Sequence, residues 1–115
     1  MSVATRYRWK HGAPRTVFIT GSRSGIGREM ARQLAAEGAD IVLFNRSAAD
    51  DVLQELRAAA RSPGQRFAAW RVDVSDAATI DAAVREAVRE LGAPDLAINS
   101  AGVLSALPVD VASRA

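Results

Sequence analysis

Short apolar segments of strand type alternate with segments of helical periodicity along most of the chain. Strands are expected at residues 16–20, 41–44 and 66–72, and a fourth begins at Leu96. Strands separated by helices pair in parallel and are joined by right-handed crossovers. The sequence therefore predicts an α/β fold, a Rossmann-type doubly wound parallel sheet that is truncated after about four strands.

Each intervening helix is expected to bury an apolar stripe against this sheet. In the first helix Ile26, Met30 and Leu34 are spaced by four residues, with Ala31 and Ala35 beside them. The expected stripes of the second and third helices are Val52, Leu53, Leu56 and Ala60, and Ile80, Val84, Val88 and Leu91.

Polar residues and glycines mark the expected ends of these helices. Ser47 and Asp50 have the spacing of a capping box for the second helix, and Ser75 is expected to cap the third. Gly38 and Gly92 are suited to end the first and third helices.

Composition excludes several classes of site. The 115 residues include no cysteine, so disulfides, thiol catalysis and thiolate metal sites are absent. The single histidine, His11, cannot form a centre with several histidine ligands, and we expect no metal site. No segment approaches the roughly 18–20 apolar residues of a membrane-spanning helix, so we expect no membrane partner.

The basic character of the chain is concentrated at its start. Residues 1–15 hold four basic residues and no acid, whereas the other hundred hold 11 basic and 13 acidic residues. We therefore divide the chain into a basic leader at 1–15 and one folded domain at 16–115, and expect no nucleic-acid partner. The leader lacks the apolar run of a secretory signal, and together with the lack of cysteine this favours a cytoplasmic protein.

A glycine-rich turn joins the first expected strand to the first expected helix. It contains Gly21, Gly25 and Gly27, and glycine permits both a sharp bend and the close approach of a ligand to the backbone. The start of the following helix favours an anion such as a dinucleotide pyrophosphate. The alternative is that the glycines only form a tight turn; their position between strand and helix favours phosphate binding.

Three motifs in order resemble the short-chain dehydrogenase/reductase family. They are Thr20-Gly21-Ser22-Arg23-Ser24-Gly25-Ile26-Gly27, Asp73-Val74 after the third strand, and Asn99-Ser100-Ala101-Gly102 after the fourth. The last is similar to the family's Asn-Asn-Ala-Gly, with Ser100 in place of the second Asn. The resemblance covers about residues 16–105. The turn is not a P-loop, because no Gly-Lys-Ser/Thr follows it. A methyltransferase stays open as an alternative, but it would leave the two later motifs unexplained.

The resemblance assigns cofactor-binding roles to matching positions. It implies that the three glycines form the phosphate turn and that Asp73 and Val74 border the adenine. It also implies that Asn99, Ala101 and Gly102 support the central sheet and pass beside the cofactor ribose. The residues implied to line the phosphate turn are Ser22, Arg23, Ser24 and Ile26.

Residues after the second strand bear on the choice of cofactor. A carboxylate there accepts hydrogen bonds from the adenosine ribose and favours NAD. This chain has Asn45, Arg46 and Ser47 instead, and a guanidinium pairs well with a 2′-phosphate. The sequence therefore predicts NADP(H) rather than NAD. Arg23 is either a second phosphate contact or a solvated loop residue.

The resemblance also implies what the chain lacks. The family transfers hydride between nicotinamide and a carbonyl or alcohol, using a Ser and a Tyr-x-x-x-Lys pair located beyond these motifs. The only tyrosine and lysine, Tyr7 and Lys10, are three residues apart and precede the first strand, so no catalytic residue is assigned.

We therefore predict an NADP(H)-dependent oxidoreductase represented by its cofactor-binding half, with the catalytic half absent and the chain alone inactive. Two alternatives stay open at this point: a non-catalytic dinucleotide-binding or regulatory module, and an interaction domain that uses a bare sheet edge. An unpaired edge strand also predicts marginal stability or a homo-oligomer. The implied substrate is a small carbonyl or alcohol compound.

Overall fold

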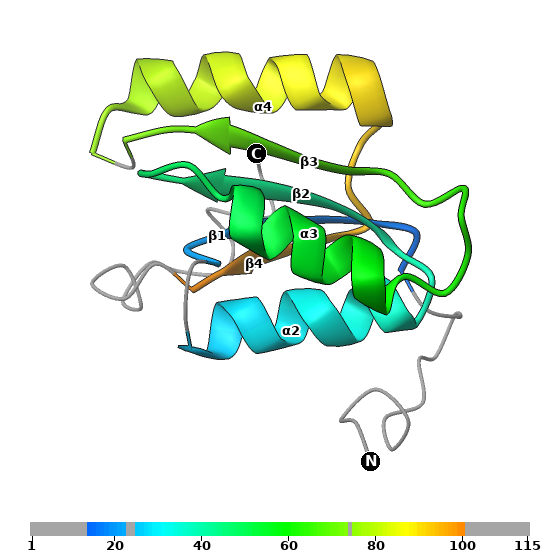
Figure 1. Cartoon of the computed structure of the whole chain (residues 1–115). Coiled ribbons are helices and arrows are strands. Elements are labelled where there is room, and N and C mark those ends of the chain that lie inside the picture. Colours follow the sequence, from blue (N-terminus) through cyan, green and yellow to red (C-terminus); the bar gives the residue numbers. More distant parts are fainter. Residues whose placement is uncertain (1–13, 23–24, 74, 101–115) are drawn as a thin grey trace.

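The computed structural model describes residues 14–22, 25–73 and 75–100. Within them lies one parallel sheet, with strand order β3-β2-β1-β4 (Figure 1). The strands are β1 Thr16–Thr20, β2 Asp40–Asn45, β3 Phe67–Arg71 and β4 Leu96–Asn99, and the helices are α2 Gly25–Ala36, α3 Asp50–Ala59 and α4 Ala77–Leu91. The predicted α/β fold with a Rossmann-type parallel sheet is confirmed.

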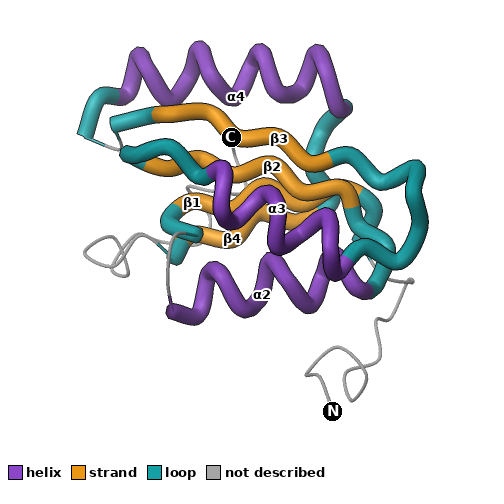
Figure 2. The backbone as a smooth tube through the Cα atoms, in the orientation of Figure 1, coloured by secondary structure: helices purple, strands orange, loops and turns teal. Residues whose placement is uncertain are grey.

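Helices cover both faces of the sheet. Figures 1 and 2 show α2 and α3 on one face and α4 on the other. Side chains along a strand alternate between the two faces, so Val17 and Ile19 pack toward α2 and α3, while Phe18 packs toward α4. Burial on both faces explains why β1 and β2 are continuous apolar runs rather than alternating ones.

The α4 face of the sheet contains a row of aromatic side chains from three strands. The rings of Phe18 and Phe44 meet edge to face with centroids 5.4 Å apart, and those of Phe44 and Trp70 stack at 6.2 Å. Ala83 and Ala87 of α4 are buried against this side of the sheet. Small residues on the helix allow it to lie close over the bulky rings.

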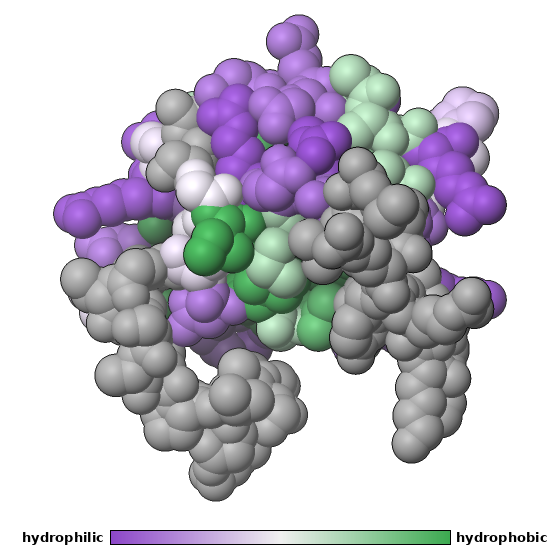
Figure 3. All heavy atoms as spheres, turned by 90° about the horizontal axis from the view of Figure 1, so that it is seen from below, coloured by the Kyte–Doolittle hydropathy of each residue, from purple (hydrophilic) through white to green (hydrophobic). Residues whose placement is uncertain are grey.

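The predicted buried stripe of α2 was wrong at two of its three large positions. Leu34 is buried, but the side chain of Ile26 is 75% exposed and that of Met30 38%. The buried residues of α2 are Gly27, Ala31, Leu34 and Ala35, so Ala31, Leu34 and Ala35 were predicted correctly. The small Gly27, Ala31 and Ala35 bring the helix axis close to the sheet and leave the larger Ile26 and Met30 outward. Figure 3 views the molecule from the α2 side and shows hydrophobic surface there between hydrophilic regions.

A similar shift occurs in α4. Leu91 is buried, and Ile80 and Val84 are partly buried against the core, as predicted. Val88 was also predicted to face the core but is 36% exposed, because Ala87 occupies the position closest to the sheet.

Both predicted serine caps were wrong. The residue before α3 is Ala49, which makes no side-chain cap bond, and Ser47 is exposed two residues further away. α4 is capped by Asp76, whose Oδ1 accepts hydrogen bonds from the backbone N–H groups of residues 78 and 79 at 3.1 and 3.3 Å. Ser75 instead donates its N–H and its hydroxyl to Asp73 Oδ1, at 2.9 and 2.7 Å. Each helix begins later than its serine predicts.

The glycine stops were predicted correctly. Gly38 lies just beyond the end of α2 with φ +107°, and Gly92 follows α4 with φ +93°. Both values lie in the left-handed region that favours glycine. None of the helices in the described ranges is both long enough and apolar enough to cross a membrane.

Candidate functional site

The predicted site residues follow the carboxyl ends of the four strands. Because all four strands are parallel, these ends lie at one edge of the sheet, where open α/β folds bind their ligands. The described site residues at this edge are Gly21, Ser22, Gly25, Ile26, Gly27, Asn45, Arg46, Ser47, Asp73 and Asn99. Arg23, Ser24, Val74, Ala101 and Gly102 lie outside the described residues.

Two glycines have the backbone conformation that the turn requires. Gly21 has φ +73° and Gly25 has φ +66°, both in the left-handed region. A Cβ atom built on Gly25 would have no atom within 4 Å, so the space above this residue is open. Gly25 also begins α2, whose first N–H groups have no partner within the helix and carry its positive dipole end. An anion can therefore approach the backbone here.

The third glycine, Gly27, permits close packing. A Cβ on Gly27 would lie 2.1 Å from Ser100 Oγ and 2.5 Å from the backbone oxygen of Gly21. The missing side chain lets the first turn of α2 lie directly against the glycine turn and the residue after β4. The close approach of helix and strand holds the turn in place.

Ser100 is a residue of this site that sequence reasoning left out. Its hydroxyl oxygen lies 2.7 Å from the carbonyl oxygen of Thr20 and 2.8 Å from that of Gly21, and its N–H donates to Thr20 at 3.0 Å. It therefore braces the turn from β4. In the sequence, Ser100 stands out only as a departure from a motif; the signal that could have identified it was a small polar residue directly after a strand.

Ser22 and Asn45 connect the glycine turn to the end of β2. Asn45 Oδ1 accepts a hydrogen bond from the Ser22 N–H at 2.9 Å, and Asn45 Nδ2 donates to Ser22 Oγ at 3.0 Å. Both residues are buried, at 0% and 3% exposed. The Asn45 carboxamide thus faces into the protein, toward the turn.

Arg46, Ser47 and Asp73 form the exposed part of the same edge. Hydrogen bonds from Ser75 to the Asp73 carboxylate lower the pKa of Asp73, and the positive charge of Arg46 lowers it further. Arg46 follows β2 and Asp73 follows the adjacent strand β3, so the two charges lie at neighbouring strand ends.

The ends of β1 and β4 are joined by a side-chain bond. Thr20 Oγ1 donates to Asn99 Oδ1 at 2.9 Å, next to the backbone pairing of the two residues. Asn99 thus ties β4 to the central strand from which the glycine turn leaves.

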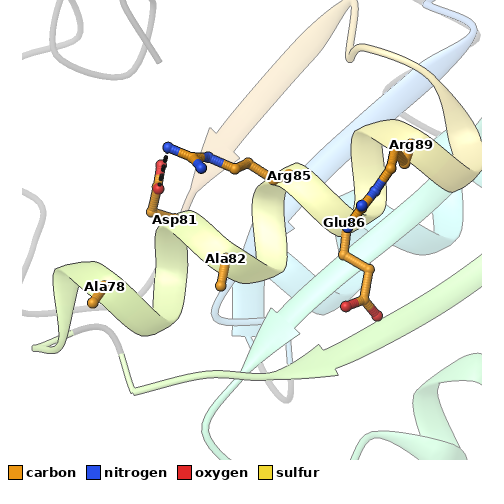
Figure 4. A pocket seen from close by; sticks show the side chains of 6 residues that line it. All are labelled: Ala78, Asp81, Ala82, Arg85, Glu86 and Arg89. Carbon is orange, nitrogen blue, oxygen red and sulfur yellow. Dashed lines mark ion pairs between the residues drawn. The ribbon is translucent and has the colours of Figure 1, made fainter.

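A shallow groove of about 550 Å³ runs along α4 (Figure 4). Its lining residues are Ala78, Asp81, Ala82, Arg85, Glu86 and Arg89. Asp81 and Arg85 form an ion pair at 2.9 Å, and Glu86 accepts a hydrogen bond from the Trp70 indole at 3.0 Å. Asp81, Arg85 and Glu86 are thus each paired within the protein, and we place the functional site at the strand ends. The described residues contain no cluster of three acidic or histidine side chains that could hold a metal ion.

Curated relatives with similar sequences are dehydrogenases. The chain is 40% identical over 89 residues to 2,3-dihydro-2,3-dihydroxybenzoate dehydrogenase of Bacillus subtilis, covering 76% of this chain and 33% of that protein. It is 37% identical over 89 residues to D-beta-hydroxybutyrate dehydrogenase of Cupriavidus necator, covering 77% and 34%. The chain therefore spans about a third of the length of these relatives.

Solved structures support the same relationship. A 3-oxoacyl-[acyl-carrier protein] reductase from Brucella melitensis in complex with NAD aligns with a TM-score of 0.69 and 32% identity, over 77% of this chain and 34% of that one. An NADH-dependent reductase complexed with NAD aligns with a TM-score of 0.65 and 30% identity, over 74% and 35%.

A family model described as short chain dehydrogenase matches residues 15–114, which is nearly the whole chain. This match extends across the glycine turn, the strand ends and the residues after β4. The similar sequences, the similar structures and this match agree, and the chain belongs to the short-chain dehydrogenase family.

Proposed function

We propose that residues 16–115 form the NAD(P)-binding part of an oxidoreductase that prefers NADP(H) and transfers hydride between nicotinamide and a small carbonyl or alcohol compound. The observation that carries this proposal is the open glycine turn at the start of α2, with the exposed Arg46 at the same sheet edge. The NAD complexes among the similar structures support dinucleotide binding by this fold.

The residues at this edge fit a dinucleotide. The left-handed Gly25 leaves open space beside the first N–H groups of α2, which suits a pyrophosphate. The adenosine ribose is expected at the end of β2, and β2 is the neighbour of β1, from which the glycine turn leaves. The bound nicotinamide would supply the hydride chemistry, and the residues of this chain would bind and orient the dinucleotide.

The preference for NADP(H) rests on the residues after β2. Position 45 is an uncharged asparagine whose carboxamide is bonded to Ser22, so no carboxylate there repels a 2′-phosphate. The next residue, Arg46, is exposed. A guanidinium and a phosphate form strong charge-assisted hydrogen bonds, so Arg46 is our choice for the 2′-phosphate contact.

The wider assignment is also a proposal. Ile26, Arg23 and Ser24 would line the phosphate turn, Ser47 would lie beside the 2′-phosphate, and Asp73 with Val74 would border the adenine. Asn99, Ala101 and Gly102 would pass beside the cofactor ribose. We also propose a cytoplasmic protein that forms homo-oligomers and whose substrate is a small molecule, as the names of the related dehydrogenases suggest.

Titration of the purified chain with NADPH and NADH tests this function. We expect NADPH to bind more tightly, and Arg46→Asp to weaken NADPH by about 10–100-fold while changing NADH little, because only NADPH has the 2′-phosphate. Arg61→Asp is the matched control, since Arg61 is exposed and lies between α3 and β3, at the opposite edge of the sheet.

The possible outcomes separate the parts of the proposal. A chain that binds neither dinucleotide would contradict the proposed function. Binding of NADH equal to or tighter than NADPH would contradict only the NADP(H) preference, and so would an equal loss of NADPH binding in both arginine variants.

A further inference from the structure

The glycine turn is held from β2 by two hydrogen bonds that occupy its first two backbone N–H groups. Gly21 donates its N–H to the carbonyl oxygen of Phe44 at 3.2 Å, and Ser22 donates its N–H to Asn45 Oδ1 at 2.9 Å. Neither group is therefore directed toward a ligand. Among the described residues, the N–H groups at the start of α2 are the ones left to face a phosphate.

Asn45 is committed to the protein through its backbone as well. Its carbonyl oxygen accepts a hydrogen bond from Val72 at 2.8 Å, and its side chain is 3% exposed. At the end of β2, Asn45 is thus bonded both to Val72, which follows β3, and to Ser22 of the glycine turn. A side chain held in this way is not available to contact ribose hydroxyls in solvent.

The carboxamide matches both partners that Ser22 offers. Its oxygen accepts the backbone N–H, and its nitrogen donates to the hydroxyl oxygen at 3.0 Å. The Ser22 hydroxyl also lies 3.2 Å from Asn45 Oδ1 and can donate to it instead. Alanine at position 45 would leave a buried N–H and a buried hydroxyl without these partners. We propose that Asn45 is a positioning residue: it fixes the glycine turn for the pyrophosphate through Ser22 and does not contact the ribose. This inference rests on the proposed function.

A positioning role and a ribose contact predict different cofactor profiles. NADPH and NADH share the pyrophosphate, so Asn45→Ala should weaken both by the same factor, about tenfold, and leave the ratio of their dissociation constants unchanged. A contact near the 2′ position would change that ratio. Isothermal titration of the 115-residue chain with each dinucleotide measures both constants.

Adenosine 2′-monophosphate separates a positioning role from general destabilisation. It has the 2′-phosphate expected at Arg46 but no pyrophosphate, so its affinity should be the same in the unmodified chain and in Asn45→Ala. The matched control is Leu56→Ala, which removes a buried core side chain on α3 away from the turn. At a temperature where circular dichroism shows that the Leu56→Ala variant is folded, this variant should bind both dinucleotides as tightly as the unmodified chain does.

Ser22→Ala removes the hydroxyl and keeps the backbone N–H, so it provides a milder second variant. If Asn45 acts through Ser22, the losses caused by Ser22→Ala and Asn45→Ala should overlap in the double variant rather than multiply. If Asn45→Ala does not fold, Ser22→Ala carries the test, with an equal fractional loss for NADPH and NADH expected. Ser62→Ala, an exposed serine in the turn before β3, is its control.

Four results would overturn the inference alone: a changed NADPH-to-NADH ratio in Asn45→Ala, weaker binding of adenosine 2′-monophosphate, losses that multiply in the double variant, or unchanged dinucleotide affinities in Ser22→Ala. An unmodified chain that binds neither dinucleotide would overturn the proposed function and this inference with it.

Discussion

At Gly27 the packing of α2 against β4 leaves no room for a side chain. A methyl group there would overlap Ser100 Oγ and the backbone oxygen of Gly21. Alanine favours a helix over glycine by about 1 kcal/mol, but the clash involves backbone that cannot rotate away. We expect Gly27→Ala to lower the free energy of unfolding by about 1–3 kcal/mol, measured by urea denaturation.

Gly64 is the matched control for this substitution. A Cβ at Gly64 would have no atom within 4 Å, and its φ lies outside the left-handed region. Gly64→Ala should therefore leave stability within about 1 kcal/mol of the unmodified chain. Equal midpoints for the two variants would show that the steric argument at Gly27 is incorrect.

Single residues were predictable from the sequence where one chemical property decides their role. Gly21 and Gly25 were predicted as turn residues, and both have positive φ. The bonding of Asn45 could not be predicted, because its partner Ser22 is 23 residues away and only the parallel pairing of β1 and β2 brings them together. The bracing by Ser100, about 80 residues from the turn, was hidden for the same reason.

Among the secondary-structure elements, α4 has a side-chain cap and α3 has none. Asp76 accepts two backbone hydrogen bonds at the start of α4, so Asp76→Ala should lower Tm by about 4–8 °C. Ser47→Ala is the control, since Ser47 does not cap α3 and should change Tm by less than about 2 °C. Thermal unfolding followed by circular dichroism measures both, and a larger loss for Ser47→Ala would contradict the assignment.

α2 contains an acid-sensitive pair on its surface. Hydrogen bonds from Arg32 and then Gln33 lower the pKa of Glu29 from 4.5 to about 2. A carboxyl group with a lower pKa in the folded state adds stability that is present above its unfolded pKa and is lost as the pH falls through the folded one. The pair is exposed to solvent, so its contribution is small.

We therefore compare Glu29→Gln with the unmodified chain at several pH values. Above pH 5, the Tm of the variant should be below that of the unmodified chain by at most about 2–4 °C. This difference in Tm should shrink as the pH falls from about 4.5 toward 2. A difference that is constant with pH would contradict the role of the ionised Glu29.

Element type and order followed from the sequence, but helix faces and caps did not. The apolar runs predicted both ends of the first three strands to within one residue, and they predicted the start of the fourth correctly. In α2 two helix faces were available to pack on the sheet, one with Ile26 and Met30 and one with glycine and alanine. The face with the smaller residues is buried, because it allows closer packing. Ser47 and Ser75 each lie within three residues of the helix start, and the path of the backbone decided which residue became the cap.

At the scale of the whole sheet, β4 is the outer strand next to β1 in the described part of the chain. Among the described residues nothing pairs with the outer edge of β4, and its side chains on the α4 side, Ala97 and Asn99, are exposed. An unpaired strand edge favours association between copies. We expect the urea midpoint of the chain to rise with protein concentration. Ala97→Lys should remove this dependence, because it adds a charge beside the edge without changing the core.

Analytical ultracentrifugation over the same concentration range provides an independent measurement. Association that weakens in Ala97→Lys would support edge pairing. A midpoint that does not change with concentration, together with a single monomeric species, would contradict it.

The strand order has a consequence for how the molecule assembles over time. β1 pairs with β2 about 24 residues later, but with β4 only after some 79 residues have intervened. Contacts between distant parts of a chain form slowly, and during synthesis the first three strands emerge from the ribosome before the fourth. Ser100, which supports the glycine turn, arrives with that last strand. The glycine turn therefore gains its support from β4 only when the most distant strand has paired.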